Sequence, residues 1–263
     1  MNHHIILTSG RSGSNYLANT LNLHPQVVNY GEILASMIIP YKLYDNCKKY
    51  KLCKWSVKEY LKFAYTSKTF FYAAQFHSTY SRFKNKKPIS FKTWKKISSL
   101  GTKDFFLNYH NKNALDFLVS NKDILIIHLY RENMLRRYMS GIFLKNTGIV
   151  SSEKDVKIKK VHIDLEEMIN YLDVLGREAE NEKIILDKLK NHNLISIRYE
   201  DYFKNPESIL DYNKQVFEFL GVEPIKLTSS HKKILPKSWD EQIENYDEFC
   251  ACLANTKYQQ YLD

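Results

Sequence analysis

The hexapeptide at positions 9–14, Ser-Gly-Arg-Ser-Gly-Ser, has the composition of a phosphate-binding turn. An apolar run, Ile5–Leu7, precedes it, and a following helix is indicated by Leu17, Leu21 and Leu23. Backbone N–H groups at a helix start favour an anion, and small residues let a phosphate approach closely. Arg11 adds a positive charge whose forked guanidinium group matches phosphate oxygens. The chemistry predicted for this turn is therefore the binding of a phosphate group.

The turn lacks the lysine that defines the nucleotide-binding loop of nucleoside triphosphatases. That motif is G-x-x-x-x-G-K-[ST], whereas here Ser14 follows Gly13. The chain also has no clear aspartate of the Walker B type. A P-loop kinase or triphosphatase is therefore disfavoured, although it stays a competing interpretation.

Residues 11–17 resemble the 5′-phosphosulfate loop of sulfotransferases that use 3′-phosphoadenosine 5′-phosphosulfate (PAPS). In that family a strand ends in [KR]-[ST]-G-[ST]-x-x-L, and this chain matches every fixed position. The resemblance implies that the loop holds the 5′-phosphosulfate and that Arg11 also stabilises the departing phosphate. The implied cofactor-binding residues of the loop are Arg11, Ser12, Gly13, Ser14, Asn15 and Tyr16.

A second segment is similar to the 3′-phosphate element of the same family, in its bacterial branch. The continuous apolar run at 124–130 reads as a buried parallel strand. Arg131 follows it in an R-x-N-x-L pattern, and Ser140 lies on the next predicted helix. The resemblance implies that the Arg131 fork and the Ser140 hydroxyl bind the 3′-phosphate.

Two further stretches agree with the family over residues 194–202 and 232–246. By resemblance, Tyr199 lies against the adenine of PAPS, although an aromatic side chain packing at a strand end is an equal alternative. Lys232 and Lys233 would close over the 3′-phosphate, the alternative being a solvated lysine pair. The resemblance covers about residues 3–34 and 100–263 and lapses between them.

The acceptor must lose a proton, and the best candidate for the general base is Glu32. It follows an apolar Val-Val pair that predicts a short strand, and in the bacterial sulfotransferases that this chain resembles, the glutamate of a Gly-Glu pair at this point is proposed as general base. A structural ion pair with Arg11 or another basic group is the alternative. His24 and His77 are rival bases, and Lys103 lies at a predicted strand end near the acceptor.

Four apolar strands must position these residues, near 4–9, 102–107, 124–130 and 194–198. They alternate with helix-like stretches, including long ones at 164–192 and 206–221, which favours an α/β fold with a parallel sheet covered by helices on both faces. The resemblance implies the three-layer sandwich of P-loop NTPases. Residues 36–99 read as a variable, mostly helical insertion on the acceptor side.

Composition sets the remaining limits. With 263 residues and 44% hydrophobic side chains, the chain is expected to form one domain over 1–263. No run of roughly 18 apolar residues exists, and the first strand starts too early for a signal peptide. These features predict a cytoplasmic protein. The four cysteines match no common zinc spacing and are read as free thiols, so no metal is expected.

The net charge of +10 is unevenly spread. Residues 42–112 hold seventeen Lys and Arg against three acidic residues, or +14, which leaves −4 for the remainder. Such a block predicts an acidic partner: an anionic acceptor, an anionic membrane surface or, less favoured, nucleic acid. Taken together, the sequence predicts a sulfotransferase that moves a sulfuryl group from PAPS to a hydroxyl or amine of a small-molecule or glycan-like acceptor, with PAP (the 3′,5′-diphosphate) as product. A non-catalytic module that binds RNA or anionic lipid is the alternative.

Overall fold

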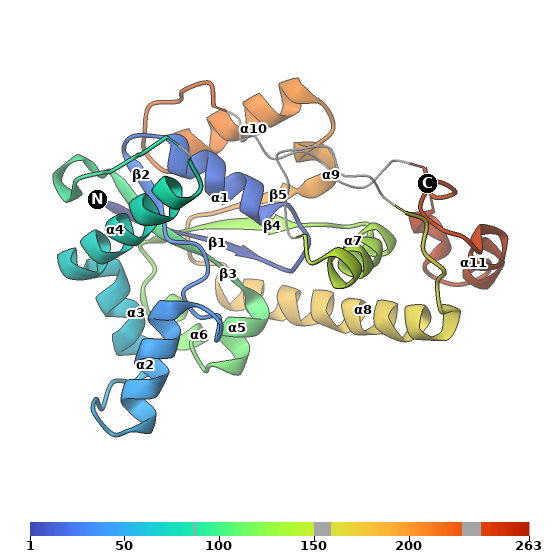
Figure 1. The fold of residues 1–263 in the computed structure, drawn as a ribbon, viewed down its shortest axis with the longest axis horizontal. Coiled ribbons are helices and arrows are strands. Elements are labelled where there is room, and N and C mark those ends of the chain that lie inside the picture. The colour runs from blue at the N-terminus through green and yellow to red at the C-terminus, as the bar shows by residue number, and fades with distance from the viewer. Residues whose placement is uncertain (87, 150–158, 228–237, 263) are drawn as a thin grey trace. The chain divides into compact units, whose positions relative to one another are not determined.

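The computed structural model describes residues 1–86, 88–149, 159–227 and 238–262. Within these ranges a five-stranded parallel sheet has the order β2-β3-β1-β4-β5 (Figure 1). Its strands are β1 (Asn2–Thr8), β2 (Val27–Asn29), β3 (Ser99–Phe105), β4 (Ile124–Tyr130) and β5 (Leu194–Arg198). The α/β prediction with a central parallel sheet flanked by helices is confirmed.

Helices cover both faces of the sheet. Helices α1 and α10 cover one face and α5 and α6 the other, as Figure 1 shows. The helices are α1 (Ser14–Leu23), α2 (Ile39–Lys49), α3 (Val57–Thr66), α4 (Lys68–Lys84), α5 (Phe106–Asn111), α6 (Leu115–Ser120), α7 (Met134–Thr147), α8 (Leu165–Lys188), α9 (Tyr199–Tyr202), α10 (Pro206–Phe219) and α11 (Tyr246–Leu253). Two 3₁₀ turns, η1 (Trp94–Lys96) and η2 (Gln259–Tyr261), complete the described elements. None of the helices in the described ranges is long and apolar enough to cross a membrane.

The chain divides into two compact units. The first comprises Met1–Ser9, Gly13–Tyr130 and Asp187–Ser229, and so holds the whole sheet. The second comprises Gly10–Ser12, Arg131–Leu186 and Ser230–Asp263. The assignment of a single domain to residues 1–263 stays a prediction.

The first unit is built around the contact of α1 and α10 with the sheet. Leu17 and Leu21, four residues apart on one side of α1, are buried with Ile6 and Ile127 of the strands. Leu23 is 45% exposed, because a side chain two positions after Leu21 points to the opposite side of the helix.

The basic segment at 36–99 is helical in several pieces, as predicted, and is anchored to the sheet. Phe71 of α4 is buried with Val28 of β2 and Leu100 of β3. The Lys92 ammonium group donates to the carbonyls of Asn22, His24 and Val27, at 2.6–2.7 Å. Burial lowers the pKa of Lys92 to about 8. This lysine therefore ties the loop after α4 to the end of α1.

The second unit has its own apolar core. Leu135 and Met139 of α7 are buried with Met168 and Leu172 of α8 and with Phe249 of α11. The core therefore fixes α7, the helix that carries the predicted phosphate-binding serine.

Candidate active site

The predicted site residues follow the carboxyl ends of the strands. All strands are parallel, so these ends share one edge of the sheet. The turn at 9–14 follows β1, Glu32 follows β2, Arg131 follows β4, and Tyr199 follows β5. The strands β1 and β4 are neighbours in the sheet. After β1 the chain continues to β2 at one edge of the sheet, and after β4 it continues to β5 at the other edge. Open α/β sheets bind ligands outside such a switch point.

Gly13 is required by the conformation at the start of α1. Its φ is 80°, in the left-handed region, and it is the N-cap residue. A Cβ here would lie 2.6 Å from a ring carbon of Phe203 and 3.2 Å from one of Tyr199. Because glycine has no side chain, no N-cap side chain accepts a hydrogen bond from the amides of the first turn of α1. An anion-binding helix start needs these amides to be available to the ligand.

The residues Gly10–Ser12 are held by side chains from the β4 end and from α7. The Arg11 Nε donates to the Ser140 Oγ at 2.9 Å, and the Arg131 Nη1 donates to the Arg11 carbonyl at 3.3 Å. The Arg137 Nε donates to the Gly10 carbonyl at 2.8 Å. The structure thus brings together Arg11, Arg131 and Ser140, which lie far apart in the sequence.

Arg137 was not predicted as a site residue, because the sequence does not distinguish it from the adjacent Arg136. It also forms an ion pair with Glu178 at 2.6 Å. Three guanidinium groups, those of Arg11, Arg131 and Arg137, therefore lie around one loop, and Glu178 lies beside the last of them. Their forked donors and the Ser140 hydroxyl are groups that bind phosphate oxygens. This donor set fits an anion with several charges.

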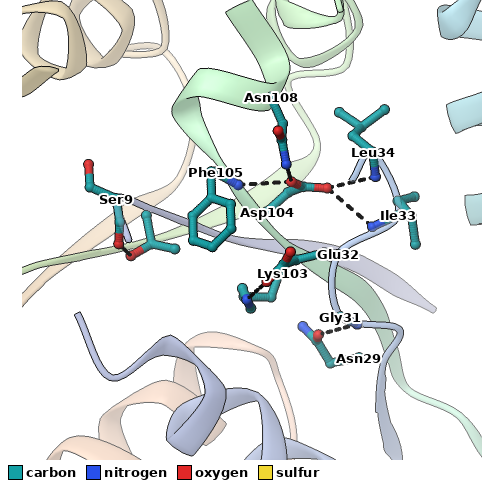
Figure 2. Close-up of polar contacts among 11 residues, drawn as sticks. Ser9, Asn29, Gly31, Glu32, Ile33, Leu34, Lys103, Asp104, Phe105 and Asn108 are labelled. Carbon is teal, nitrogen blue, oxygen red and sulfur yellow. Dashed lines mark hydrogen bonds and ion pairs between the residues drawn. The ribbon is translucent and has the colours of Figure 1, made fainter. Parts of the chain in front are cut away.

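Glu32 forms an ion pair with Lys103 of β3 (Figure 2). The Lys103 side chain is 3% exposed and the Glu32 side chain 26%. Burying an ammonium group costs free energy unless it is paired or hydrogen-bonded, and here Glu32 is the paired group, which agrees with the ion-pair alternative for Glu32. The Glu32 side chain is thus paired and still partly exposed.

Asp104, next to Lys103 on β3, fixes the segment that follows Glu32. One carboxylate oxygen accepts from the amides of Ile33 and Leu34, at 3.1 and 2.9 Å. The other accepts from the Phe105 amide at 2.9 Å and from the Asn108 side chain at 2.5 Å (Figure 2). Burial raises the pKa of Asp104 to about 6, and these hydrogen bonds act in the opposite direction.

Asn29 holds the backbone on the other side of Glu32. Its Oδ1 accepts from the Gly31 amide at 3.0 Å, and its Nδ2 donates to the Thr102 carbonyl at 2.9 Å. The Lys103 amide in turn donates to the Gly31 carbonyl at 3.0 Å. Glu32 therefore lies on a backbone fixed from both ends, which limits the positions that its carboxylate can take.

The two rival bases differ in their surroundings. His24 is 2% exposed, and its Nδ1 accepts from the Gln26 amide while its Nε2 faces the Glu223 carbonyl, at 3.1 and 3.0 Å. Burial lowers the pKa of His24. Both ring nitrogens of His24 thus have hydrogen-bond partners. His24 lies at the end of α1, and α1 leads away from the carboxyl end of β1. His77 is exposed on α4.

The remaining predicted cofactor contacts have mixed surroundings. The Tyr199 ring lies 4.6 Å from the Phe203 ring, and both adjoin Gly13. The Tyr16 ring packs edge-on against Phe203 at 5.1 Å. Ser14 is buried and Asn15 half-buried in the first turn of α1. Lys232 and Lys233 lie outside the described residues.

The burial of Asp104 predicts a pH dependence of stability. Its pKa of about 6 exceeds the ordinary 3.8, so the folded chain binds this proton more tightly than the unfolded chain. Its contribution to the free energy of unfolding is greatest below about pH 4 and falls by about 3 kcal/mol as pH rises through 6. Denaturant unfolding of the wild type and of Asp104→Asn, over this range, measures it. The difference in unfolding free energy between the two proteins should decline with pH, and a flat difference would contradict the raised pKa.

The chain was compared with known proteins. No family model matches it. A chaperone protein HtpG of Rickettsia canadensis is 27% identical over 181 residues, which are 60% of this chain and 28% of that protein. The chain thus spans under a third of the length of that curated relative. Among solved structures, a sulfotransferase from Alicyclobacillus acidocaldarius is similar with 14% identity and a TM-score of 0.47, over 99% of this chain and 95% of the other. These likenesses do not assign the chain to a family.

Proposed function

We propose that this chain transfers a sulfuryl group from PAPS to a hydroxyl or amine of a small-molecule or glycan-like acceptor. The observation that carries the proposal is the meeting of Arg11, Arg131 and Ser140 at one loop. The motif resemblance assigns these residues to phosphate groups of one ligand, and that assignment requires them to lie together. The left-handed Gly13 at the adjoining helix start gives independent support for an anion.

The donor set of the loop fits the two phosphate-bearing ends of PAPS. Arg11 and the amides of the first turn of α1 would hold the 5′-phosphosulfate, and Arg131 with Ser140 would hold the 3′-phosphate. When bound, PAPS supplies a sulfuryl group attached to a phosphate leaving group. Arg11 then provides a fixed positive charge for the negative charge that develops on the leaving phosphate.

Glu32 is proposed as the group that accepts the proton of the acceptor. Its side chain is partly exposed, and Asp104 and Asn29 hold the backbone on both sides of it. On accepting the proton Glu32 becomes neutral, and Lys103 keeps its positive charge without the countercharge. The loss of this ion pair is part of the cost of the proton transfer.

Thermal melting with PAP tests the proposal. PAP at about 100 times its dissociation constant should add about 2.7 kcal/mol of stability and raise the melting temperature by roughly 5–10 °C. ATP with Mg²⁺ and a short RNA serve as parallel ligands. No shift with PAP would refute the proposed function. A shift with ATP and Mg²⁺ alone would indicate a kinase, and stabilisation by RNA alone a binding module.

A further inference from the structure

The exposed apolar surface of this protein is concentrated in the basic segment. In the described part of the chain, most of the large apolar side chains with high exposure lie between Met37 and Phe91. On α4, Phe76, Tyr80 and Phe83 are 65%, 67% and 71% exposed. Their spacing of four and three residues places them on one side of the helix. Large exposed apolar patches mark surfaces that bind a partner or a membrane.

The packing of α4 does not account for this side of the helix. Its other side carries Phe71, which is buried in the core, and Gln75, whose side-chain oxygen accepts from the Lys92 amide at 3.1 Å. A surface helix that buries one side normally presents polar side chains on the other. The aromatic residues on the outer side of α4 therefore need a reason outside the fold.

The loop after α4 extends the same surface. The Phe91 ring lies 5.4 Å from the Phe76 ring, and Phe91 is 43% exposed. Ile89, two residues earlier, is 61% exposed. The buried Lys92 ammonium group holds this loop in place. Phe76, Tyr80, Phe83, Ile89 and Phe91 are called the aromatic patch below.

The charge around the aromatic patch is wholly positive in the sequence. Between residues 60 and 103 there is no aspartate or glutamate, against ten lysines and arginines. Lys84 and Lys86, at the end of α4, and Lys95 and Lys96, on η1, are exposed. Exposed aromatic side chains in a stretch of chain that carries exposed lysines and no acidic residue are complementary to a surface that is apolar inside and negatively charged outside.

We propose that the aromatic patch binds the surface of an anionic lipid bilayer, with phenylalanine and isoleucine side chains at the acyl boundary and lysines at the headgroups. Burial of apolar side chains and attraction to anionic lipids are the two contributions that hold peripheral helices on membranes. Tyr80 suits the interface, since its ring is apolar and its hydroxyl polar. RNA is less complementary, because phenylalanine and isoleucine gain most from an apolar medium and the bases of RNA are only partly apolar. This inference is independent of the proposed sulfuryl transfer.

Co-sedimentation of the full chain with vesicles tests the inference. We expect binding to vesicles of phosphatidylcholine with phosphatidylglycerol, weak binding to phosphatidylcholine alone, and release by added salt. The double variant Tyr80→Ser with Phe83→Ser should bind the anionic vesicles roughly 100-fold more weakly, since each of the two lost rings costs about a factor of ten. The matched control is Val174→Ser with Ile184→Ser, a pair of exposed positions on α8 (40% and 56%), which should bind as the wild type.

Circular dichroism and thermal melting of both double variants are measured alongside. These measurements tell a loss of vesicle binding from a folding defect. Equal binding of wild type and Tyr80→Ser, Phe83→Ser would overturn the inference, as would equal binding to neutral and anionic vesicles. Binding of a short RNA without binding of vesicles would assign the patch to nucleic acid instead. A dimer in sedimentation velocity that the double variant abolishes, with no vesicle binding, would assign it to self-association.

Discussion

Replacing Glu32 by glutamine should lower turnover by about 10²–10⁴-fold and leave the affinity for PAP unchanged. That range is the usual contribution of a positioned general base. Glutamine keeps the shape of the side chain but cannot take a proton from the acceptor. Turnover is followed as transfer of radiolabelled sulfate from PAPS across a screen of hydroxyl and amine acceptors, and PAP affinity by calorimetry.

The controls separate the loss of a base from the loss of an ion pair. Glu32→Gln leaves the ammonium group of Lys103, whose side chain is 3% exposed, without its countercharge, so the variant is expected to melt at a lower temperature. Glu32→Asp keeps the charge but shortens the side chain by one methylene, and should restore stability more than turnover. Glu207→Gln, in the first turn of α10, is the neutral control. An active Glu32→Gln variant would exclude Glu32 and turn attention to His77, because both ring nitrogens of His24 are engaged.

The sequence predicts the strands well where an apolar run marks them. The runs at 124–130 and 194–198 coincide with β4 and β5. The strand expected at 102–107 begins three residues earlier, at Ser99, and ends two residues earlier, at Phe105. β3 carries Ser99, Thr102, Lys103 and Asp104 as buried residues, so its polar side chains concealed a strand that is buried on both faces.

The partners within the site could not be read from the sequence in the same way. Lys103 and Asp104 act on the segment after β2 because β3 lies between β2 and β1 in the sheet. Nothing in the spacing of residues 32 and 103 indicates that order. Asp104 offered a possible signal, since an aspartate directly after Thr-Lys in a buried strand needs hydrogen-bond donors, and it receives four of them.

Replacing Arg131 by alanine should weaken PAP binding by about 10²–10⁴-fold, measured by calorimetry. Two charge-assisted hydrogen bonds to a phosphate contribute about 1.5–3 kcal/mol each, and every 1.4 kcal/mol is a factor of ten. Arg177→Ala, at an exposed position on α8, is the matched control and should bind PAP as the wild type. Unchanged PAP affinity in Arg131→Ala would refute the assigned role.

A second ligand tells a direct contact of Arg131 from an indirect one. Arg131 also donates to the Arg11 carbonyl, so its loss could disturb the loop at 10–12 without involving a 3′-phosphate. Adenosine 5′-phosphosulfate has the same 5′ group as PAPS but lacks the 3′-phosphate. If Arg131 binds that phosphate, the alanine variant should lose affinity for PAP and keep most of its affinity for adenosine 5′-phosphosulfate. Equal losses for both ligands would contradict the direct contact and make Arg131 a positioning residue, because only an effect that depends on the 3′-phosphate identifies a group that touches it.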